Sequence, residues 1–359
     1  MFMRNTWYMV GWSRDFHSGK LVPFTLLNEK IVLYRKTDGS MAALADRCSH
    51  RLAPLSQGCL EGDDVRCMYH GLKFDSGGRN IEVPFGGRPL PVLNVRSYPV
   101  EERYSGVWVW MGDPEKADAS RIVNFVGIED PAWAIAPGRM DYNANYRLVN
   151  DNLLDLSHVS FVHRDSFLGG RAYRPDTVDT ARPTVTALEN GVRVQRFAPS
   201  VPTMQMIKER FPKGQMCDQV QAYDFLVPGI FLMRHTMYPE GALARAKAQG
   251  LPEGTVHEEP LYDTFTCQAV TPLTDKTTCY FFAFGPWSKA PEDTQLFADL
   301  GLEAFSEDRV VVEGQQRVME SAPEQKMKLL ALDGAAVLYW RIVDKLMQAD
   351  QAPAEQVPV

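Results

Sequence analysis

The sequence has 359 residues, of which 23% are charged and 45% hydrophobic, the balance typical of a water-soluble globular protein. This length suits two ordinary domains or one large domain with insertions. A formal net charge of −7 does not favour a nucleic-acid partner, and no apolar run is long enough to form a membrane helix. The N-terminal residues lack the basic-then-apolar order of a signal peptide, so we expect a cytoplasmic protein.

The first third of the chain is expected to be rich in β-strands. Short stretches of β-branched and aromatic residues, separated by glycine, aspartate and asparagine turn signals, occur at 31–34, 41–45 and 107–110. A polar run at 113–118 marks the end of this region. The sequence therefore predicts a first domain at 1–115.

Two short cysteine–histidine pairs lie inside this β-rich region. Cys48 is two residues before His50, and Cys67 is three residues before His70. Two thiolates and two imidazoles are the ligands of a Rieske [2Fe–2S] cluster, with one pair on each iron. A structural zinc ion would take the same four groups, but the flanking residues resemble strands rather than the helix of a zinc finger. Gly71 follows the second pair and permits a left-handed backbone there.

A second group of metal-binding residue types lies in a segment with helical periodicity, 142–163. Asn152, Asp155 and His158 are spaced three apart, and His163 follows five residues later. Two histidines and a carboxylate form the facial triad of mononuclear iron sites. On a regular helix the two histidines would be separated by about 140°. The helix must therefore end or distort near His158 if both bind one ion. The alternative is an ordinary buried pair of Asp155 and His158.

Strand-like and helical stretches are expected in the remainder of the chain. The strand-like stretches run through 192–197, 223–235 and 265–284. A last amphipathic helix is expected at 294–319. We assign residues 116–347 to a second domain, and we expect an exposed mobile loop at 241–258 and a flexible tail at 348–359.

The last expected helix offers a carboxylate on its apolar face. Asp308 has apolar residues three and four positions away on both sides, and burying a carboxylate without a partner is costly. A cation is therefore expected beside Asp308, which makes it the candidate third ligand. Glu307 remains an alternative, because a charge near a helix start fits it as well.

Two further side chains are candidates for lining a substrate pocket. His235 follows Arg234 at the end of a strand-like run, where the pair could face a substrate carboxylate. His235 is equally compatible with an ordinary position at a strand edge. Gln268 is a weaker candidate for the same pocket.

The two metal-binding patterns carry a family resemblance. The segments CSHRLAPLS (48–56) and CMYHGLKFD (67–75), and the pattern N-x-x-D-x-x-H-x-x-x-x-H at 152–163, resemble the Rieske non-haem iron oxygenases. The segments at 4–8 and 28–34 are similar to the vanillate and dicamba O-demethylase branch. Ser49 and Met68 stand where the family often has proline, but neither is a ligand.

The resemblance implies a fold and a set of cofactors. The fold is α+β, with an N-terminal Rieske β-domain and a helix-grip-like catalytic domain in which helices flank an antiparallel sheet. The implied [2Fe–2S] ligands are Cys48, His50, Cys67 and His70, and the implied ligands of a mononuclear Fe(II) are His158, His163 and Asp308. Asp155 is implied to bridge this iron to the cluster of a neighbouring subunit, which in turn implies a homotrimer. Asn152 is implied to lie beside the iron as a non-ligand.

The resemblance also implies an activity. The chain would be the terminal oxygenase of a multicomponent monooxygenase that uses O₂ to oxidise an aromatic substrate. No G-x-G-x-x-G nucleotide motif is present, so a ferredoxin or an NAD(P)H-dependent reductase would supply the electrons. The expected reaction is O-demethylation of a methoxy aromatic acid. The alternatives are a ring-hydroxylating dioxygenase or a methyl-group hydroxylase of the same family. A Rieske electron carrier is a further alternative from another class of protein, but most of this chain lies beyond the cluster motif.

Overall fold

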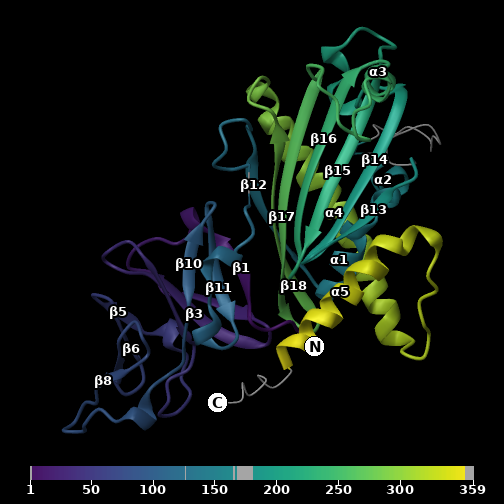
Figure 1. Cartoon of the computed structure of the whole chain (residues 1–359). Helices are drawn as coiled ribbons and strands as arrows, with labels where there is room; N and C mark the ends of the chain where they lie inside the picture. Colours follow the sequence, from purple (N-terminus) through teal and green to yellow (C-terminus); the bar gives the residue numbers. More distant parts are fainter. Residues whose placement is uncertain (1, 126, 165, 168–180, 352–359) are drawn as a thin grey trace, which may run out of the picture. The chain divides into compact units, whose positions relative to one another are not determined.

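The computed structural model describes residues 2–125, 127–164, 166–167 and 181–351 (Figure 1). The chain divides into two compact units. The first comprises Met1–Asn124 and Thr271–Thr278, and the second comprises Phe125–Val270 and Cys279–Val359. Among the described residues, no helix combines the length and the apolar character needed to cross a bilayer.

The first unit is built from small sheets. Their hydrogen-bonded strand orders are β1-β11-β10, β2-β3-β4-β9 and β5-β6-β7-β8. The strands are β1 (Thr6–Trp12), β2 (Val22–Leu26), β3 (Glu29–Arg35), β4 (Met41–Ala45), β5 (Cys59–Glu61), β6 (Asp64–Arg66), β7 (Lys73–Phe74), β8 (Asn80–Glu82), β9 (Ser97–Tyr98), β10 (Val100–Arg103) and β11 (Gly106–Met111). The strands expected at 31–34, 41–45 and 107–110 are confirmed as β3, β4 and β11.

Strand β3 separates two hydrophobic cores in this unit. Its side chains Ile31, Val32, Leu33 and Tyr34 are all fully buried, so the strand is a continuous apolar run rather than an alternating one. Ile31 and Leu33 pack into one core, whereas Val32 and Tyr34 pack into the other. The second core also contains Cys48 and Cys67. Packing of β3 therefore fixes the base of both cysteine-containing loops.

The second unit is organised around a large sheet with strand order β12-β18-β17-β16-β15-β14-β13. Neighbouring strands from β13 to β17 pair in antiparallel fashion. The strands are β12 (Ala136–Tyr142), β13 (Thr184–Leu188), β14 (Gly191–Pro202), β15 (Met216–Leu226), β16 (Ile230–Pro239), β17 (Tyr262–Thr274) and β18 (Thr277–Pro286). The expected stretches at 223–235 and 265–284 each prove to be parts of two strands joined by a tight turn.

Helices accompany this sheet (Figure 1). The α-helices are α1 (Tyr146–Leu154), α2 (Val159–Val162), α3 (Ala242–Ala248), α4 (Thr294–Ser321) and α5 (Gly334–Gln351). Short 3₁₀ turns lie at η1 (Ser13–Asp15), η2 (Leu55–Gln57), η3 (Pro91–Leu93), η4 (Pro114–Lys116), η5 (Ala119–Arg121), η6 (Leu156–His158), η8 (Gln205–Arg210), η9 (Pro291–Asp293) and η10 (Ala331–Asp333). Helix α4 contacts β12 and α1, whereas α5 contacts β13 and β14.

Three expectations about the second unit need correction. The helix expected at 294–319 is present as α4 but is not the last, because α5 follows it and buries Tyr339 against Phe225. Residues 348–351, expected in a flexible tail, belong to α5, and residues 352–359 lie outside the described part of the chain. The expected loop at 241–258 contains α3, whose Ala242 and Ala246 are buried. Burial of these small side chains stabilises a helix that the surrounding glycine and proline residues concealed in the sequence.

Candidate metal centres

The two cysteine-containing loops have matching backbone geometry. The amide of Leu52 donates to the carbonyl of Cys48 over 2.9 Å, and the amide of Gly71 donates to the carbonyl of Cys67 over 3.1 Å. Leu52 and Gly71 both have positive φ, at 59° and 73°. The left-handed residue four positions after each cysteine closes each loop into a tight turn. The expectation of a left-handed backbone at Gly71 is confirmed.

The four candidate ligands of these loops separate into an inner and an outer pair. Cys48 and Cys67 are each only 2% exposed, whereas His50 is exposed and its ring centroid lies 4.6 Å from that of His70. No three of these four residues have ligand atoms that all lie within 4.8 Å of one another. Among the described residues, a group that meets this distance is found at the second centre. A single tetrahedral zinc would need all four atoms around one point. Two separated pairs instead fit a cluster with two irons.

The second centre depends on a break in the helix. Helix α1 ends at Leu154, and its C-cap residue Asp155 has an extended backbone at φ −130° and ψ 101°. The Asp155 carboxylate then accepts hydrogen bonds from the amide and the hydroxyl of Ser157, which caps η6. The break expected near His158 is therefore present, three residues earlier. It turns the chain so that His158 and His163 face the same point, with ring centroids 5.2 Å apart.

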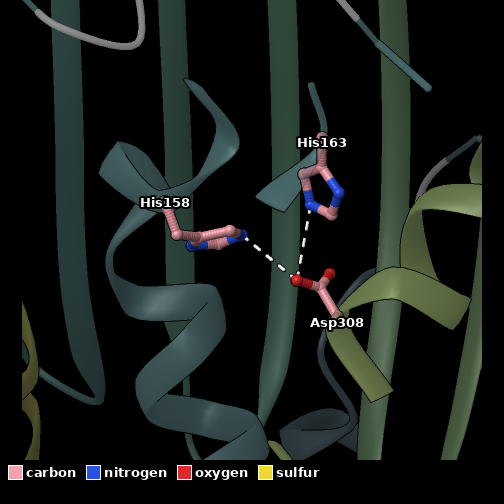
Figure 2. A group of neighbouring side chains, drawn as sticks. All are labelled: His158, His163 and Asp308. Atoms are coloured by element: carbon pink, nitrogen blue, oxygen red, sulfur yellow. Dashed lines mark ion pairs between the residues drawn. The ribbon is translucent and has the colours of Figure 1, made fainter. Parts of the chain in front are cut away.

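Asp308, from helix α4, completes this group (Figure 2). Its Oδ1 lies 3.3 Å from Nε2 of His158 and 3.4 Å from Nε2 of His163. Asp308 is 3% exposed, and its ligand atom lies within 4.8 Å of those of both histidines. Burial alone would raise the pKa of Asp308, but the adjacent His158 and His163 side chains lower it overall. The side chain is therefore an ionised carboxylate beside two imidazoles, the donor set of a mononuclear iron site.

Each histidine is oriented by its second ring nitrogen. Nδ1 of His158 lies 2.6 Å from the backbone carbonyl oxygen of Asp155, and Nδ1 of His163 lies 2.8 Å from Oε2 of Glu307. Both acceptors lack a hydrogen when Glu307 is ionised, so Nδ1 of each ring is the donor. The Nε2 atoms therefore keep free lone pairs beside Asp308. Hydrogen bonds of this kind orient the histidine ligands of many metal sites.

This geometry gives different roles to the two neighbouring carboxylates. Glu307 contacts His163 and the hydroxyl of Ser166, and it lies outside the group formed by Asp308 and the histidines. The amide of Asn152 donates to Oδ1 of Asp308 over 3.0 Å, so Asn152 lies beside the centre. The geometry favours Asp308 over Glu307 as the third ligand and Asn152 as a non-ligand.

Replacement of Glu307 by glutamine tests the orienting hydrogen bond. We expect Glu307→Gln to weaken iron binding at the mononuclear site by about 10- to 100-fold, because a neutral amide holds the His163 ring less firmly. Iron affinity can be measured by titrating the iron-depleted protein with Fe(II). Glu303→Gln makes the same charge change at an exposed position of the same helix. Equal affinities in the two variants would contradict the role of Glu307.

A cavity of about 180 Å³ opens beside the histidines and Asp308. Apolar lining residues include Phe231, Phe284 and Phe305, which suit an aromatic ring. Met204 and Met206 also line it, and both pack in the hydrophobic cluster that includes Phe297. Both expected pocket residues, His235 and Gln268, line the cavity as well.

One wall of the cavity comes from alternate residues of adjacent strands. Side chains separated by two along β15, β16 and β17 face the same side of the sheet. These are Gln219, Gln221, Phe231, Met233, His235, Thr264, Thr266 and Gln268. The sequence interpretation missed the glutamines of β15 and the threonines of β17. Their signal was the recurrence of polar residues at every second position of otherwise apolar strands.

One expectation about a basic residue is not supported. Arg234, expected to face a substrate together with His235, does not line the cavity and forms a salt bridge with Asp263. Alternation along β16 explains this, because consecutive side chains point to opposite faces. Near the cysteine-containing loops, Arg66 is paired with Glu61 and Glu82. The positive charge of Arg66 is therefore balanced by these two carboxylates.

Comparison with known proteins identifies two matching domains. The family model of the vanillate O-demethylase oxygenase C-terminal domain matches residues 142–349, and that of the Rieske [2Fe–2S] domain matches residues 6–99. The chain is 33% identical to the iron–sulfur subunit of the toluene-4-sulfonate monooxygenase system of Comamonas testosteroni, covering 98% of each chain. It is also 33% identical to the dicamba O-demethylase oxygenase component of Stenotrophomonas maltophilia, covering 98% of this chain and 99% of that one.

Solved structures agree with the sequence matches. The crystal structure of dicamba monooxygenase bound to dicamba matches with a TM-score of 0.82 and 31% identity, covering 98% of this chain and 99% of that chain. The match extends over both units, and it includes the Rieske domain as well as the domain that carries His158, His163 and Asp308.

Proposed function

Because this chain belongs to the Rieske non-haem iron oxygenases, in the branch of the vanillate and dicamba O-demethylase oxygenase components, we propose that it removes the methyl group of a methoxy aromatic compound. The observation that carries this proposal is the convergence of His158, His163 and Asp308 on one wall of a cavity lined with aromatic side chains.

The chain is the terminal oxygenase component of a Rieske monooxygenase system, with a [2Fe–2S] cluster and a mononuclear iron as cofactors. Such components depend on a reductase or ferredoxin for electrons and act on an aromatic substrate. When bound, the cluster supplies single electrons and the mononuclear iron activates O₂. The balanced reaction consumes the methoxy compound, O₂, two electrons and two protons, and yields a phenol, formaldehyde and water.

The cluster, the mononuclear iron and the substrate are each assigned to a different set of residues. We assign the cluster to Cys48, His50, Cys67 and His70, because their loops separate two buried thiols from two outer imidazoles. We assign the mononuclear iron to His158, His163 and Asp308, and the orienting hydrogen bond on His163 to Glu307. The phenylalanine and methionine side chains of the cavity exclude water and hold the aromatic ring.

We assign Asp155 to the passage of electrons between cluster and iron, with the neighbouring chain of a homotrimer as donor. Asp155 is supported in this role by its place at the end of α1, where its carboxylate is held by Ser157 and lies 3.7 Å from the guanidinium of Arg196. Exposed apolar side chains on the two cysteine-containing loops support a subunit interface at those loops. Leu52 is 68% exposed and Met68 is 61% exposed.

The docking partner is proposed to be an acidic ferredoxin or reductase domain in the cytoplasm. Two exposed arginines of the first cluster loop, Arg47 and Arg51, support this proposal, because an acidic partner would be steered to them.

Formaldehyde release tests the proposed reaction. With a surrogate reductase and NADH, we expect a panel of methoxyphenols, methoxybenzoates and dimethoxybenzenes to include a substrate that gives formaldehyde and the matching phenol in equal amounts. The phenol can be measured by chromatography and the formaldehyde by derivatisation. Substrate-dependent O₂ uptake without formaldehyde from any member would contradict demethylation.

Hydroxylation of an aromatic methyl group is the second candidate, because the toluene-4-sulfonate monooxygenase subunit is among the relatives with 33% identity. The same cavity and iron ligands would serve this reaction, since only the atom that carries the methyl group differs. A benzyl alcohol product from a methylarene, without formaldehyde, would favour it. Ring hydroxylation to a cis-diol is the third outcome that the product analysis distinguishes.

A further inference from the structure

A short chain of hydrogen bonds lines one wall of the substrate cavity. Nε2 of Gln219 donates to the backbone carbonyl of Pro202 over 2.8 Å. Oε1 of the same amide lies 2.9 Å from Nε2 of His235. Gln219, Pro202 and His235 all line the cavity that also contains His158, His163 and Asp308. These hydrogen-bonded residues therefore line the proposed substrate cavity.

The backbone carbonyl of Pro202 fixes which atom donates and which accepts in each of these hydrogen bonds. A backbone carbonyl has no hydrogen to give, so the nitrogen of the Gln219 amide must face Pro202 and its oxygen must face His235. That oxygen can only accept, and Nε2 of His235 must therefore carry the hydrogen. A neutral imidazole has one N–H group, which leaves Nδ1 of His235 as a hydrogen-bond acceptor. No described residue forms a hydrogen bond with this Nδ1 atom.

The surroundings keep the imidazole neutral. Burial lowers the pKa of His235 to about 4. Among the described residues that line the cavity there is no lysine or arginine, so none of them offers a positive charge to an anion. The cavity also contains Oε1 atoms of Gln205 and Gln268 without a hydrogen-bond partner in the described chain. The side-chain amides of Gln205 and Gln268 can rotate by 180° and so exchange donor and acceptor, whereas the tautomer of His235 is held by Gln219.

We propose that His235 selects the substrate by accepting a hydrogen bond from it at Nδ1, so that the cavity takes a neutral methoxyarene with a donor group, such as a methoxyphenol, in preference to a carboxylate. This inference rests on the proposed function and revises the expectation of an aromatic acid. A carboxylate has no hydrogen to donate, so it would leave Nδ1 of the half-buried His235 without a hydrogen-bond partner, which costs binding free energy. Sites built around a substrate hydroxyl group reject analogues that lack it.

Equilibrium binding to the full chain with both metals loaded tests this selection independently of turnover. The probes are 2-methoxyphenol, 1,2-dimethoxybenzene and 2-methoxybenzoate, measured by calorimetry under argon. We expect 2-methoxyphenol to bind about tenfold more tightly than 1,2-dimethoxybenzene, which lacks the donor. We expect 2-methoxybenzoate to bind more weakly than 2-methoxyphenol. Tighter binding of the benzoate would overturn the proposal.

Two variants separate the hydrogen bond from simple packing. His235→Phe keeps a ring but removes the acceptor, so the advantage of 2-methoxyphenol over 1,2-dimethoxybenzene should disappear while the latter binds as before. Equal weakening of both ligands would show a packing role and overturn the proposal. Gln219→Leu frees the tautomer of His235 and should shift preference toward 2-methoxybenzoate, and an unchanged preference would also overturn it. If the binding pattern holds but no methoxyarene gives formaldehyde, the proposed demethylation fails and the selection by His235 stands.

Discussion

Replacing Asp308 by alanine is expected to remove the mononuclear iron while the [2Fe–2S] cluster remains. The carboxylate is the anionic member of the group with His158 and His163, and two imidazoles alone bind Fe(II) weakly. Iron content should fall from about three to about two per chain, because the cluster contributes two irons and the second centre one. Product formation should be lost. Iron quantitation together with the visible spectrum of the cluster measures both effects.

An exposed aspartate of the same helix provides the matched control. Asp299→Ala removes a carboxylate that only accepts a hydrogen bond from Gln295, so iron content and turnover should match those of the unaltered chain. Retention of about three irons per chain in Asp308→Ala would exclude Asp308 as the ligand. Glu307 would then be the carboxylate to replace next, because it lies on the same turn of α4.

Replacing Asp155 by asparagine is expected to leave both metals in place and to slow electron delivery to the iron. Asparagine keeps an oxygen for the Ser157 amide, so the cap of η6 and the position of His158 should survive. It removes the negative charge, and hydrogen bonds to charged groups contribute about 1.5–3 kcal/mol. At about 1.4 kcal/mol per factor of ten, reoxidation of the reduced cluster should slow by roughly 10- to 100-fold. Stopped-flow absorbance with substrate and O₂ measures this rate.

The proposed path between the subunits of a homotrimer can be tested with chains that are inactive alone. A Cys67→Ser chain lacks a proposed cluster ligand, and an Asp308→Ala chain lacks a proposed iron ligand. Co-expressed as mixed trimers, they should recover part of the activity, because the cluster of one chain then serves the iron of another. Inactive mixed trimers that retain both metals would show that electrons stay within one chain.

A normal rate of cluster reoxidation in Asp155→Asn would show that the Asp155 carboxylate is not needed for electron transfer to the iron.

Much of the first centre was evident in the sequence because its ligands are local. Cys48 and His50 lie in one tight loop, and Cys67 and His70 in another, so spacing alone indicates each pair. The glycine at position 71 was interpretable for the same reason, since a single residue determines whether the backbone can turn there. The strand β3 beneath these loops was also visible, as an unbroken run of buried apolar residues.

The second centre was visible only in part. The spacing of His158 and His163 required the helix to end, and the structure places that end at Asp155, whose side chain caps the following turn. The choice between Glu307 and Asp308 needed the tertiary structure, because both are carboxylates on one helix. Their order in space follows from the packing of α4, which turns Asp308 toward the histidine nitrogens and Glu307 toward the far side of the His163 ring.

The sequence by itself indicated the four candidate ligands of the cluster and the two candidate histidines of the second centre, because ligand types at short spacing are a local property of the chain. Only the tertiary structure decided the chemistry of the substrate cavity. Gln219, His235 and Thr264 come from three strands, and the antiparallel register of those strands brings them to one wall. The tautomer of His235 depends, through Gln219, on the backbone carbonyl of Pro202 at the end of β14, a relation that no spacing in the sequence records.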